Sequence, residues 1–304
     1  MNIKTTTTLA VLASFALAGS AMAQDLPANV KKLADGVYVV VGDNFFSNSG
    51  IVATQDGVVV IDTGQNPVET RKIVDIIKKI TPMPVRLVID SEPHPDHTTG
   101  HFLFPGATIV GAAGAGESMR NREKQDPERI QKLAATSPAM KTALEGYKFI
   151  PPHLEYQQKA SLAVGGRNLE LTYMPNVHSE ADTAVWLPNE RIVFSASGIL
   201  VKQINIFRPN VTIPDILAAS KMLKGLNPAH VVPGHGVPGG TEIFDENDKY
   251  YALLIERVEK LIKEGKTLEQ LQKEVKMPEY ASWANQERFP TNVEAAYRML
   301  SGKK

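Results

Sequence analysis

The chain has 304 residues, no cysteine, and 33 acidic side chains balanced by 33 basic ones. A balanced charge with no basic surplus argues against a nucleic-acid-binding protein. The absence of cysteine excludes disulfides and thiolate ligands, so a metal site in this chain has to be built from nitrogen and oxygen donors.

The first 23 residues have the pattern of a secretory signal peptide. A basic start at Lys4 precedes an apolar run over 9–19 and the small residues Ala21 and Ala23. We expect cleavage after Ala23, which predicts a periplasmic or secreted protein formed by residues 24–304. The alternative, an N-terminal membrane anchor, is disfavoured because spanning a bilayer core of about 30 Å needs about 20 apolar residues. We expect no membrane association after cleavage.

The first half of the mature chain alternates strands with a helix. Pro67 fits the first position of a helix that continues to about Ile80. The alternation indicates an α/β layered domain, and continuous β-branched runs indicate strands that are covered on both faces. Strands are predicted at 36–41, 50–54, 57–61, 85–89 and 107–110.

The pattern becomes polar and helical over about 113–146. This segment is interpreted as a helical insertion near the mouth of a site, and a solvated excursion without a role remains the alternative. Strands then resume, and the tail over about 245–304 is predicted to be helical, with capping boxes that begin at Thr267 and Thr291. The second-half elements are a hairpin over 160–173, strands at 183–187 and 191–194, a helix over 213–226, and a strand that begins at His230.

The loop after the predicted strand 85–89 carries the chemistry. Residues two apart lie on one face of an extended segment, so Glu92 shares a face with His94, and His94 with Asp96. His97 projects elsewhere. The loop can present Glu92 and His94 to one metal, and Asp96 and His97 to a second. The prolines between these residues fix φ and pre-set the loop.

Two later histidines, His178 and His235, lie at strand-to-loop transitions and read as the third ligand of each metal. In this order the residues resemble the metallo-β-lactamase superfamily, whose hallmark is His-x-His-x-Asp-His after a strand, a later histidine, a bridging position, and a histidine in Pro-Gly-His-Gly. The resemblance covers roughly 37–237. The matching positions are Glu92, His94, Asp96, His97, His178, Ser197 and His235, with Asp62 at the position of an aspartate that braces the metal loop.

The resemblance implies a four-layer αββα sandwich with two metal ions, zinc in the first instance, at one edge of two sheets. Glu92 departs from the pattern by replacing the first histidine. A carboxylate is a harder ligand and adds negative charge, which leaves manganese or iron open beside zinc. The metal-bridging aspartate is missing from 194–198, where Ser197 stands. This argues against glyoxalase II, ribonuclease Z and typical homoserine-lactone lactonases, whereas β-lactamases resemble this chain in having a cysteine or a serine there. At the position of Glu92, some class B3-like β-lactamases are similar to this chain, with glutamine or glutamate.

The implied activity is metal-dependent hydrolysis of a cyclic amide in a small-molecule substrate, as in a β-lactamase, with Asp96 orienting the attacking water as well as binding metal. Two alternatives stay open: a hydrolase of another ester, lactone or thioester, of the quinoprotein-associated type, and a non-hydrolytic iron protein that handles oxygen. Phe45 and Phe46 are candidates for an apolar flap over the substrate or for ordinary strand-end packing. Lys202, with Arg208 nearby, is a candidate for substrate binding. The oligomeric state stays open.

Overall fold

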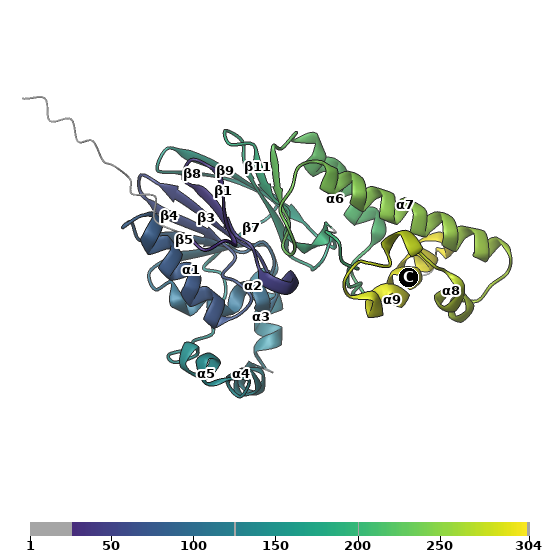
Figure 1. Cartoon of the computed structure of the whole chain (residues 1–304), viewed down its shortest axis with the longest axis horizontal. Helices are drawn as coiled ribbons and strands as arrows, with labels where there is room; N and C mark the ends of the chain where they lie inside the picture. The colour runs from purple at the N-terminus through teal and green to yellow at the C-terminus, as the bar shows by residue number, and fades with distance from the viewer. Residues whose placement is uncertain (1–25, 125, 200, 303–304) are drawn as a thin grey trace, which may run out of the picture.

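The computed structural model describes residues 26–124, 126–199 and 201–302 (Figure 1). The signal peptide predicted over residues 1–23 lies outside this part of the chain. In the described residues, no helix is both long and apolar enough to cross a membrane.

Two sheets lie face to face. The first has seven strands in chain order, antiparallel from β1 to β4 and parallel from β4 to β7. The second has five, in the order β12-β11-β10-β9-β8. The strands of the first sheet are β1 (Val30–Ala34), β2 (Val37–Val40), β3 (Ser49–Thr54), β4 (Gly57–Ile61), β5 (Val85–Ile89), β6 (Thr108–Ala112) and β7 (Leu154–Tyr156). Those of the second are β8 (Lys159–Val164), β9 (Arg167–Met174), β10 (Asp182–Leu187), β11 (Ile192–Phe194) and β12 (His230–Val232).

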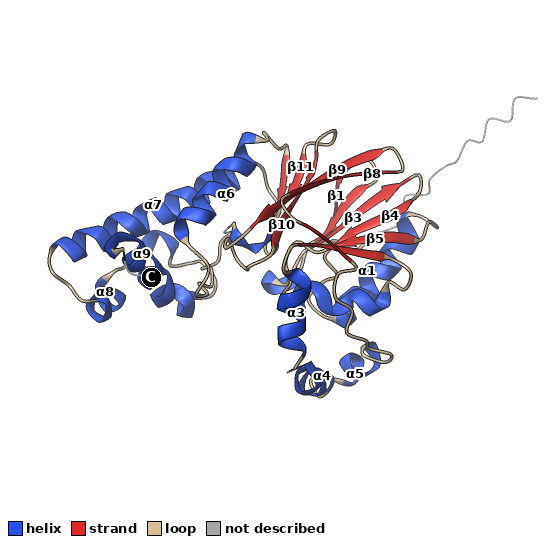
Figure 2. Ribbon diagram, turned by 180° about the vertical axis from the view of Figure 1, so that it is seen from behind, coloured by secondary structure: helices blue, strands red, loops and turns tan. Residues whose placement is uncertain are grey.

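Alternate residues of the buried strands face different layers. Val59 of β4 belongs to the core between the sheets, whereas Val58 and Val60 pack towards α1 (Pro67–Ile80). In the second sheet, Trp186 and Val193 face α6 (Ile213–Gly225) and α7 (Glu242–Lys263). The order of layers is therefore helix, sheet, sheet, helix, and the predicted αββα sandwich is confirmed (Figure 2).

The α1 helix begins as the sequence predicts. The side chain of Asn66 accepts hydrogen bonds from the backbone nitrogens of Val68 and Glu69, and Pro67 occupies the first turn. Its apolar stripe, which includes Ile73 and Ile77, packs on the outer face of the first sheet. This packing holds the sheet edge from which the 92–97 loop emerges.

Three helices occupy the segment between β6 and β7: α3 (Ala115–Glu123), α4 (Asp126–Ala134) and α5 (Pro138–Ala143). They lie within 113–146, where a helical insertion is predicted. They lie below the first sheet in Figure 1, beside the short helix α2 (Pro95–Thr98), which forms the second half of the 92–97 segment, and η2 (Thr99–Leu103), which follows it.

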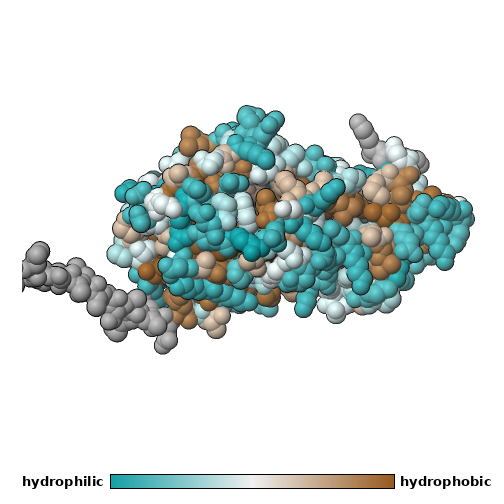
Figure 3. Space-filling model, turned by 90° about the horizontal axis from the view of Figure 1, so that it is seen from above, coloured by the Kyte–Doolittle hydropathy of each residue, from teal (hydrophilic) through white to brown (hydrophobic). Residues whose placement is uncertain are grey.

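The tail is helical, as predicted, and forms an arm beside α6 with α7, α8 (Leu268–Glu274), η4 (Pro278–Tyr280), η5 (Gln286–Arg288) and α9 (Phe289–Ser301) (Figure 1). The capping box at Thr267 is present. The one predicted at Thr291 is wrong, because α9 begins two residues earlier and the Thr291 hydroxyl donates to the Arg288 carbonyl. Hydrophobic residues gather towards this end of the molecule in Figure 3, while the sandwich is mostly hydrophilic in that view.

Candidate metal centre

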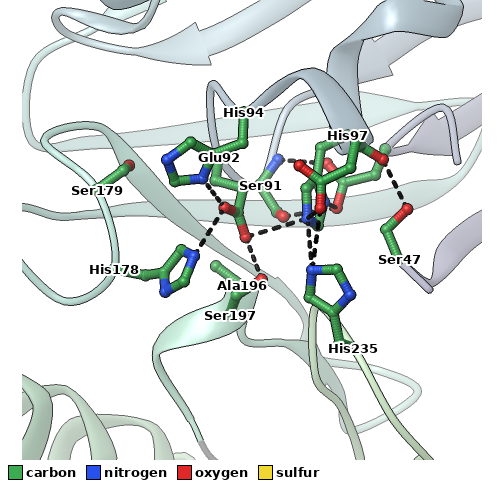
Figure 4. A network of polar contacts seen from close by, with 12 residues as sticks. Ser47, Ser91, Glu92, His94, His97, His178, Ser179, Ala196, Ser197 and His235 are labelled. Atoms are coloured by element: carbon green, nitrogen blue, oxygen red, sulfur yellow. Dashed lines mark hydrogen bonds and ion pairs between the residues drawn. The ribbon is translucent and has the colours of Figure 1, made fainter. Parts of the chain in front are cut away.

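One edge of the sandwich collects the metal-ligand candidates. The 92–97 loop follows β5, His178 lies in the turn between β9 and β10, and His235 follows β12. Ser197 lies in η3 (Ala196–Gly198), just after β11. Although these positions are far apart in the sequence, their side chains converge on one small volume (Figure 4).

The first cluster consists of Glu92, His94 and His178, all buried, with potential ligand atoms within 4.8 Å of one another. His178 Nε2 lies 3.4 Å from Glu92 Oε2, and His94 Nδ1 contacts the same oxygen closely. The two imidazole rings meet edge to face with centroids 5.1 Å apart. The side chain of Asn205 fixes the His178 ring through a 3.1 Å contact between its Oδ1 and His178 Nδ1, so that Nε2 faces the cluster.

The second cluster consists of Glu92, His97 and His235, with Asp96 beside it. His97 Nε2 lies 3.3 Å from Glu92 Oε1 and 3.2 Å from His235 Nε2. Asp96 Oδ2 lies 3.3 Å from His235 Nε2 and 3.6 Å from His97 Nε2. The sequence assigns Glu92 to one metal, but in the structure its two oxygens face different clusters.

The hydrogen bonds behind the second cluster favour a cation in front of it. His97 Nδ1 donates to Asp62 Oδ2 at 2.8 Å, and His235 Nδ1 donates to the Phe45 carbonyl at 2.7 Å. In the neutral rings both Nε2 atoms are then lone-pair acceptors, and they point at each other beside two carboxylates. Such an arrangement of imidazole nitrogens and carboxylate oxygens fits a metal ion of the zinc, manganese or iron type.

The charges of the two clusters shift one another's titration. Burial alone would raise the pKa of Glu92, but the neighbouring His97, His178 and His94 hold it well below its usual range. Burial alone would lower the pKa of His97, and the surrounding carboxylates, Glu92 first, hold it well above its usual value. At His178 burial prevails and lowers the pKa to about 3. In the metal-free site the surrounding carboxylates therefore favour the protonated form of His97.

Asp62 lies where the resemblance implies it should, behind the metal loop. Its carboxylate accepts hydrogen bonds from the Ser91 backbone nitrogen at 2.7 Å and from the Ser91 hydroxyl at 2.6 Å, as well as from His97. Asp62 adopts a left-handed backbone conformation, φ 58°. The start and the end of the metal loop are thus tied to one buried carboxylate.

Ser197 lies beside Glu92, to which its hydroxyl donates at Oε1. It is therefore in hydrogen-bond contact with the carboxylate that both clusters share. Gly234 packs closely against this turn, and a Cβ at that position would come within 2.2 Å of the Ser197 Oγ. This close approach explains a glycine just before His235.

Three supporting residues have no counterpart in the sequence predictions. Asp182 accepts from the backbone nitrogens of His178 at 2.6 Å and Ser179 at 2.8 Å, which shapes the turn that presents His178. Asn48 donates to the Pro233 and Gly236 carbonyls at 2.8 Å each and shapes the loop around His235. The third is Asn205. Asp182 lies four residues after a candidate ligand, and that spacing is the one signal that could have identified it.

A cavity of about 280 Å³ opens in front of the clusters. Phe45 and Phe46, both partly exposed, lie on its wall. Of the two basic candidates for substrate binding, Lys202 is exposed and does not line the cavity, whereas Arg208 does line it, together with Arg288. Arg208 Nη1 donates to His178 Nε2 at 3.2 Å and to the His178 carbonyl at 3.1 Å.

Two curated proteins resemble this chain in sequence. A linear primary-alkylsulfatase from Pseudomonas sp. (strain ATCC 19151) is 21% identical over 75% of this chain and 49% of its own length. A type 2 metallo-beta-lactamase from Bacteroides fragilis is 28% identical over 36% of this chain and 46% of its own length. The chain thus spans about half the length of the curated relatives it matches.

Two solved structures have the same fold. The inverting sec-alkylsulfatase Pisa1 from Pseudomonas sp. superimposes with a TM-score of 0.69 at 19% identity, over 91% of this chain and 50% of its own. A metallo-beta-lactamase from Pontibacter korlensis gives a TM-score of 0.56 at 19% identity, over 71% of this chain and 94% of its own. The sequence pattern of the Metallo-beta-lactamase superfamily matches residues 42–235. The chain therefore belongs to the metallo-beta-lactamase superfamily.

Proposed function

We propose that this protein hydrolyses a small molecule whose reacting group is itself an anion, with a sulfate ester as the first candidate substrate. Two metal ions, zinc in the first instance, are held by the two clusters that share Glu92. Bound ions of this kind lower the pKa of water towards about 7 and withdraw charge from a substrate oxygen. Asp96, whose side chain is 31% exposed at the cavity, accepts a hydrogen bond from the attacking water and orients it.

The position of Arg208 is the observation that favours an anionic substrate. Its guanidinium is half-buried, and in the described part of the chain it forms no ion pair with a carboxylate. Its donors reach the ring and the carbonyl of His178 instead. A half-buried guanidinium that lacks a carboxylate partner is expected to bind an anion from solution.

The short distance between Arg208 and His178 favours charge on the reacting group itself. An anion bound by Arg208 would lie directly against the first cluster. A sulfate ester brings its negative charge to that place. In a β-lactam the carboxylate is a separate substituent, at some distance from the scissile amide. Its binding would require a cation farther from the first cluster than Arg208. The likeness to two alkylsulfatases supports this choice.

A β-lactam remains the second candidate. Ser197 stands where the family's bridging aspartate is missing, as in β-lactamases with a serine there, and the comparisons include two metallo-beta-lactamases. Its hydroxyl donates to the shared Glu92 carboxylate. Because the residue is a serine, this position adds no further acidic side chain to the cavity.

The test is a substrate panel on purified, metal-loaded protein: a primary and a secondary alkyl sulfate, nitrocefin, and a neutral ester and thioester. We expect chelator-sensitive hydrolysis of an alkyl sulfate. Arg208→Gln should raise KM for the sulfate by about tenfold or more, because a charge-assisted contact is lost, and should spare any turnover of the neutral ester. The matched control Lys202→Gln should behave like the unchanged protein.

Three results would overturn the proposal. Turnover of nitrocefin with inert alkyl sulfates would reject the first candidate in favour of the second. Turnover of the neutral ester or thioester alone would reject an anionic substrate. Iron as the bound metal, together with oxygen consumption and no hydrolysis, would reject hydrolysis altogether.

A further inference from the structure

The loop that carries Glu92, His94 and Asp96 has a second face. Its alternate residues, Pro93 and Pro95, line a separate cavity of about 520 Å³. The opposite wall of this cavity belongs to the insertion, through α3, α4 and the segment around Tyr147. The insertion therefore stands directly behind the metal loop, although a cavity keeps the two largely apart.

Arg122 of α3 crosses this gap and reaches two loops at once. Its Nη1 donates to the Pro93 carbonyl at 3.2 Å, between Glu92 and His94. Its Nη2 lies 3.7 Å from Glu180 Oε1, two residues after His178. One planar guanidinium thus joins the segments that carry two imidazoles of the first cluster, and its fork of fixed donors suits this bridging.

A second arginine supports the same loop from α4. Arg129 Nη1 donates to Thr99 Oγ1 at 3.2 Å, and the Thr99 hydroxyl donates to the Pro95 carbonyl at 2.6 Å. Arg129 is itself held by the carboxylate of Asp126, which also accepts from the Tyr147 hydroxyl. The donor that faces the metal loop is therefore fixed in place rather than free in solvent.

The far end of the insertion is anchored to the sandwich. Arg71 of α1 donates through Nε at 3.2 Å and Nη2 at 3.0 Å to the Ala143 carbonyl at the end of α5. A segment fixed to α1 at one end and to the metal loop at the other is placed to brace the loop. A freely moving excursion would not need these contacts.

We propose that Arg122 is a positioning residue, which fixes the His94 loop and the His178 turn relative to each other and so sets the metal affinity of the first cluster. The inference rests on the proposed metal-dependent function. Arg122 is 35% exposed and Glu180 43%, so their ion pair is worth little as a stabilising charge contact. The ion pair acts by fixing the positions of the two segments. Removal of residues that orient metal ligands changes metal affinity by about 10–100-fold.

The experiment measures the metal dissociation constant by competition with a chromophoric chelator, and the rise in Tm on metal loading. Arg122→Gln should weaken one of the two metal-binding steps, the one that belongs to the first cluster, by about tenfold. It should also reduce the metal-induced rise in Tm. The Tm of the metal-free protein should change little. Arg120→Gln is the matched control, because Arg120 is an exposed arginine on the same helix.

Further variants separate positioning from folding. Glu180→Gln should weaken metal affinity in the same direction, and it keeps the test valid if Arg122→Gln fails to fold. Arg122→Lys should restore only part of the affinity, because an ammonium lacks the fork that reaches both loops.

Unchanged metal affinity in a folded Arg122→Gln protein, or an equal loss in Arg120→Gln, would overturn the inference. If Arg122→Gln does not fold, unchanged affinity in Glu180→Gln would do the same. These results differ from failure of the proposed function, which is judged by what the unaltered, metal-loaded protein hydrolyses. A metal-loaded protein that does not hydrolyse alkyl sulfates would still report whether Arg122 sets metal affinity.

Discussion

At the scale of single residues, Glu92 is the departure with the largest consequence. The family pattern has a histidine there, which offers one nitrogen to one metal. A carboxylate offers two oxygens, and here Oε2 faces His178 while Oε1 faces His97. Because a carboxylate can ligate through both oxygens, the glutamate places one potential ligand atom in each cluster where a histidine would supply one nitrogen to one of them.

Removing the charge of Glu92 should therefore affect both clusters. We expect Glu92→Gln, which keeps the shape of the side chain, to lower the total metal bound per chain after dialysis, as measured by plasma mass spectrometry. Glu117→Gln, at an exposed position of α3, is the control and should retain full metal content. Loss of one metal with the other bound as tightly as before would show that the carboxylate serves a single cluster.

His97 gives the metal-free protein a characteristic pH dependence. Its pKa in the folded state is raised well above that in the unfolded chain, despite burial, by Glu92, Asp62 and Asp96. The stabilisation is therefore complete below about pH 6.5 and is lost as the pH rises through the folded-state pKa.

We expect the free energy of unfolding by urea, measured with a chelator present, to fall as the pH rises above about 6.5, the unfolded-state pKa of histidine. With zinc bound, His97 is held neutral, so its contribution to this fall in the free energy of unfolding should disappear. A metal-free protein whose stability is constant or rises above this pH would contradict the assignment of the proton to His97.

At the scale of elements, the site depends on loops that are tied to distant strands. Asn48, just before β3, is 3% exposed and donates to both carbonyls that flank the His235 turn. Asn48→Ala would leave two carbonyls without a donor and should cost about 1–3 kcal/mol in the free energy of unfolding. Asn168→Ala, at an exposed position of β9, should change it by less than about 0.5 kcal/mol. Equal effects in urea titrations would show that the turn holds its shape without Asn48.

The sequence predicts the elements well where the signal is local. The alternation of Glu92 and His94 with prolines agrees with the loop as far as His94, and Asn66 with Pro67 marks the start of α1. The extended segment predicted for Asp96 is wrong, because the helix α2 begins at Pro95. The short strands β1 and β7 were not predicted, since β1 mixes lysines with apolar residues and β7 has three residues. The contacts of Asn48 span 185 and 188 residues, and no local pattern encodes such a pairing.

At the scale of the whole molecule, the helical tail reaches back to the site. The Tyr250 hydroxyl of α7 donates to Asn292 Oδ1 at 3.0 Å, and Asn292 Nδ2 donates to the Asn205 carbonyl at 2.8 Å. Asn205 in turn holds His178. The tail also contributes Asn285 and Arg288 to the cavity wall. The arm is thus part of the candidate site as well as a cover for the second sheet.

Truncating Tyr250 should disturb both roles. Its side chain is fully buried, in contact with Tyr251, Tyr280 and Trp283. We expect Tyr250→Ala to cost about 3–5 kcal/mol in the free energy of unfolding, as for other large buried aromatic side chains. Tyr250→Phe, which loses only the hydroxyl, should cost about 1 kcal/mol. A similar cost for both variants would show that the ring packing contributes little.

The aromatic cluster of the arm also supplies an optical reporter. The chain has two tryptophans: Trp283 stacks on Tyr250 in the arm, and Trp186 lies on the second sheet beneath α6. Both are almost completely shielded from water, so each should change its emission when its own surroundings open. With Trp186 replaced by phenylalanine, fluorescence would follow the arm alone, and with Trp283 replaced, the sandwich alone. Two denaturation curves that coincide would mean that the sandwich and the arm unfold as one cooperative unit.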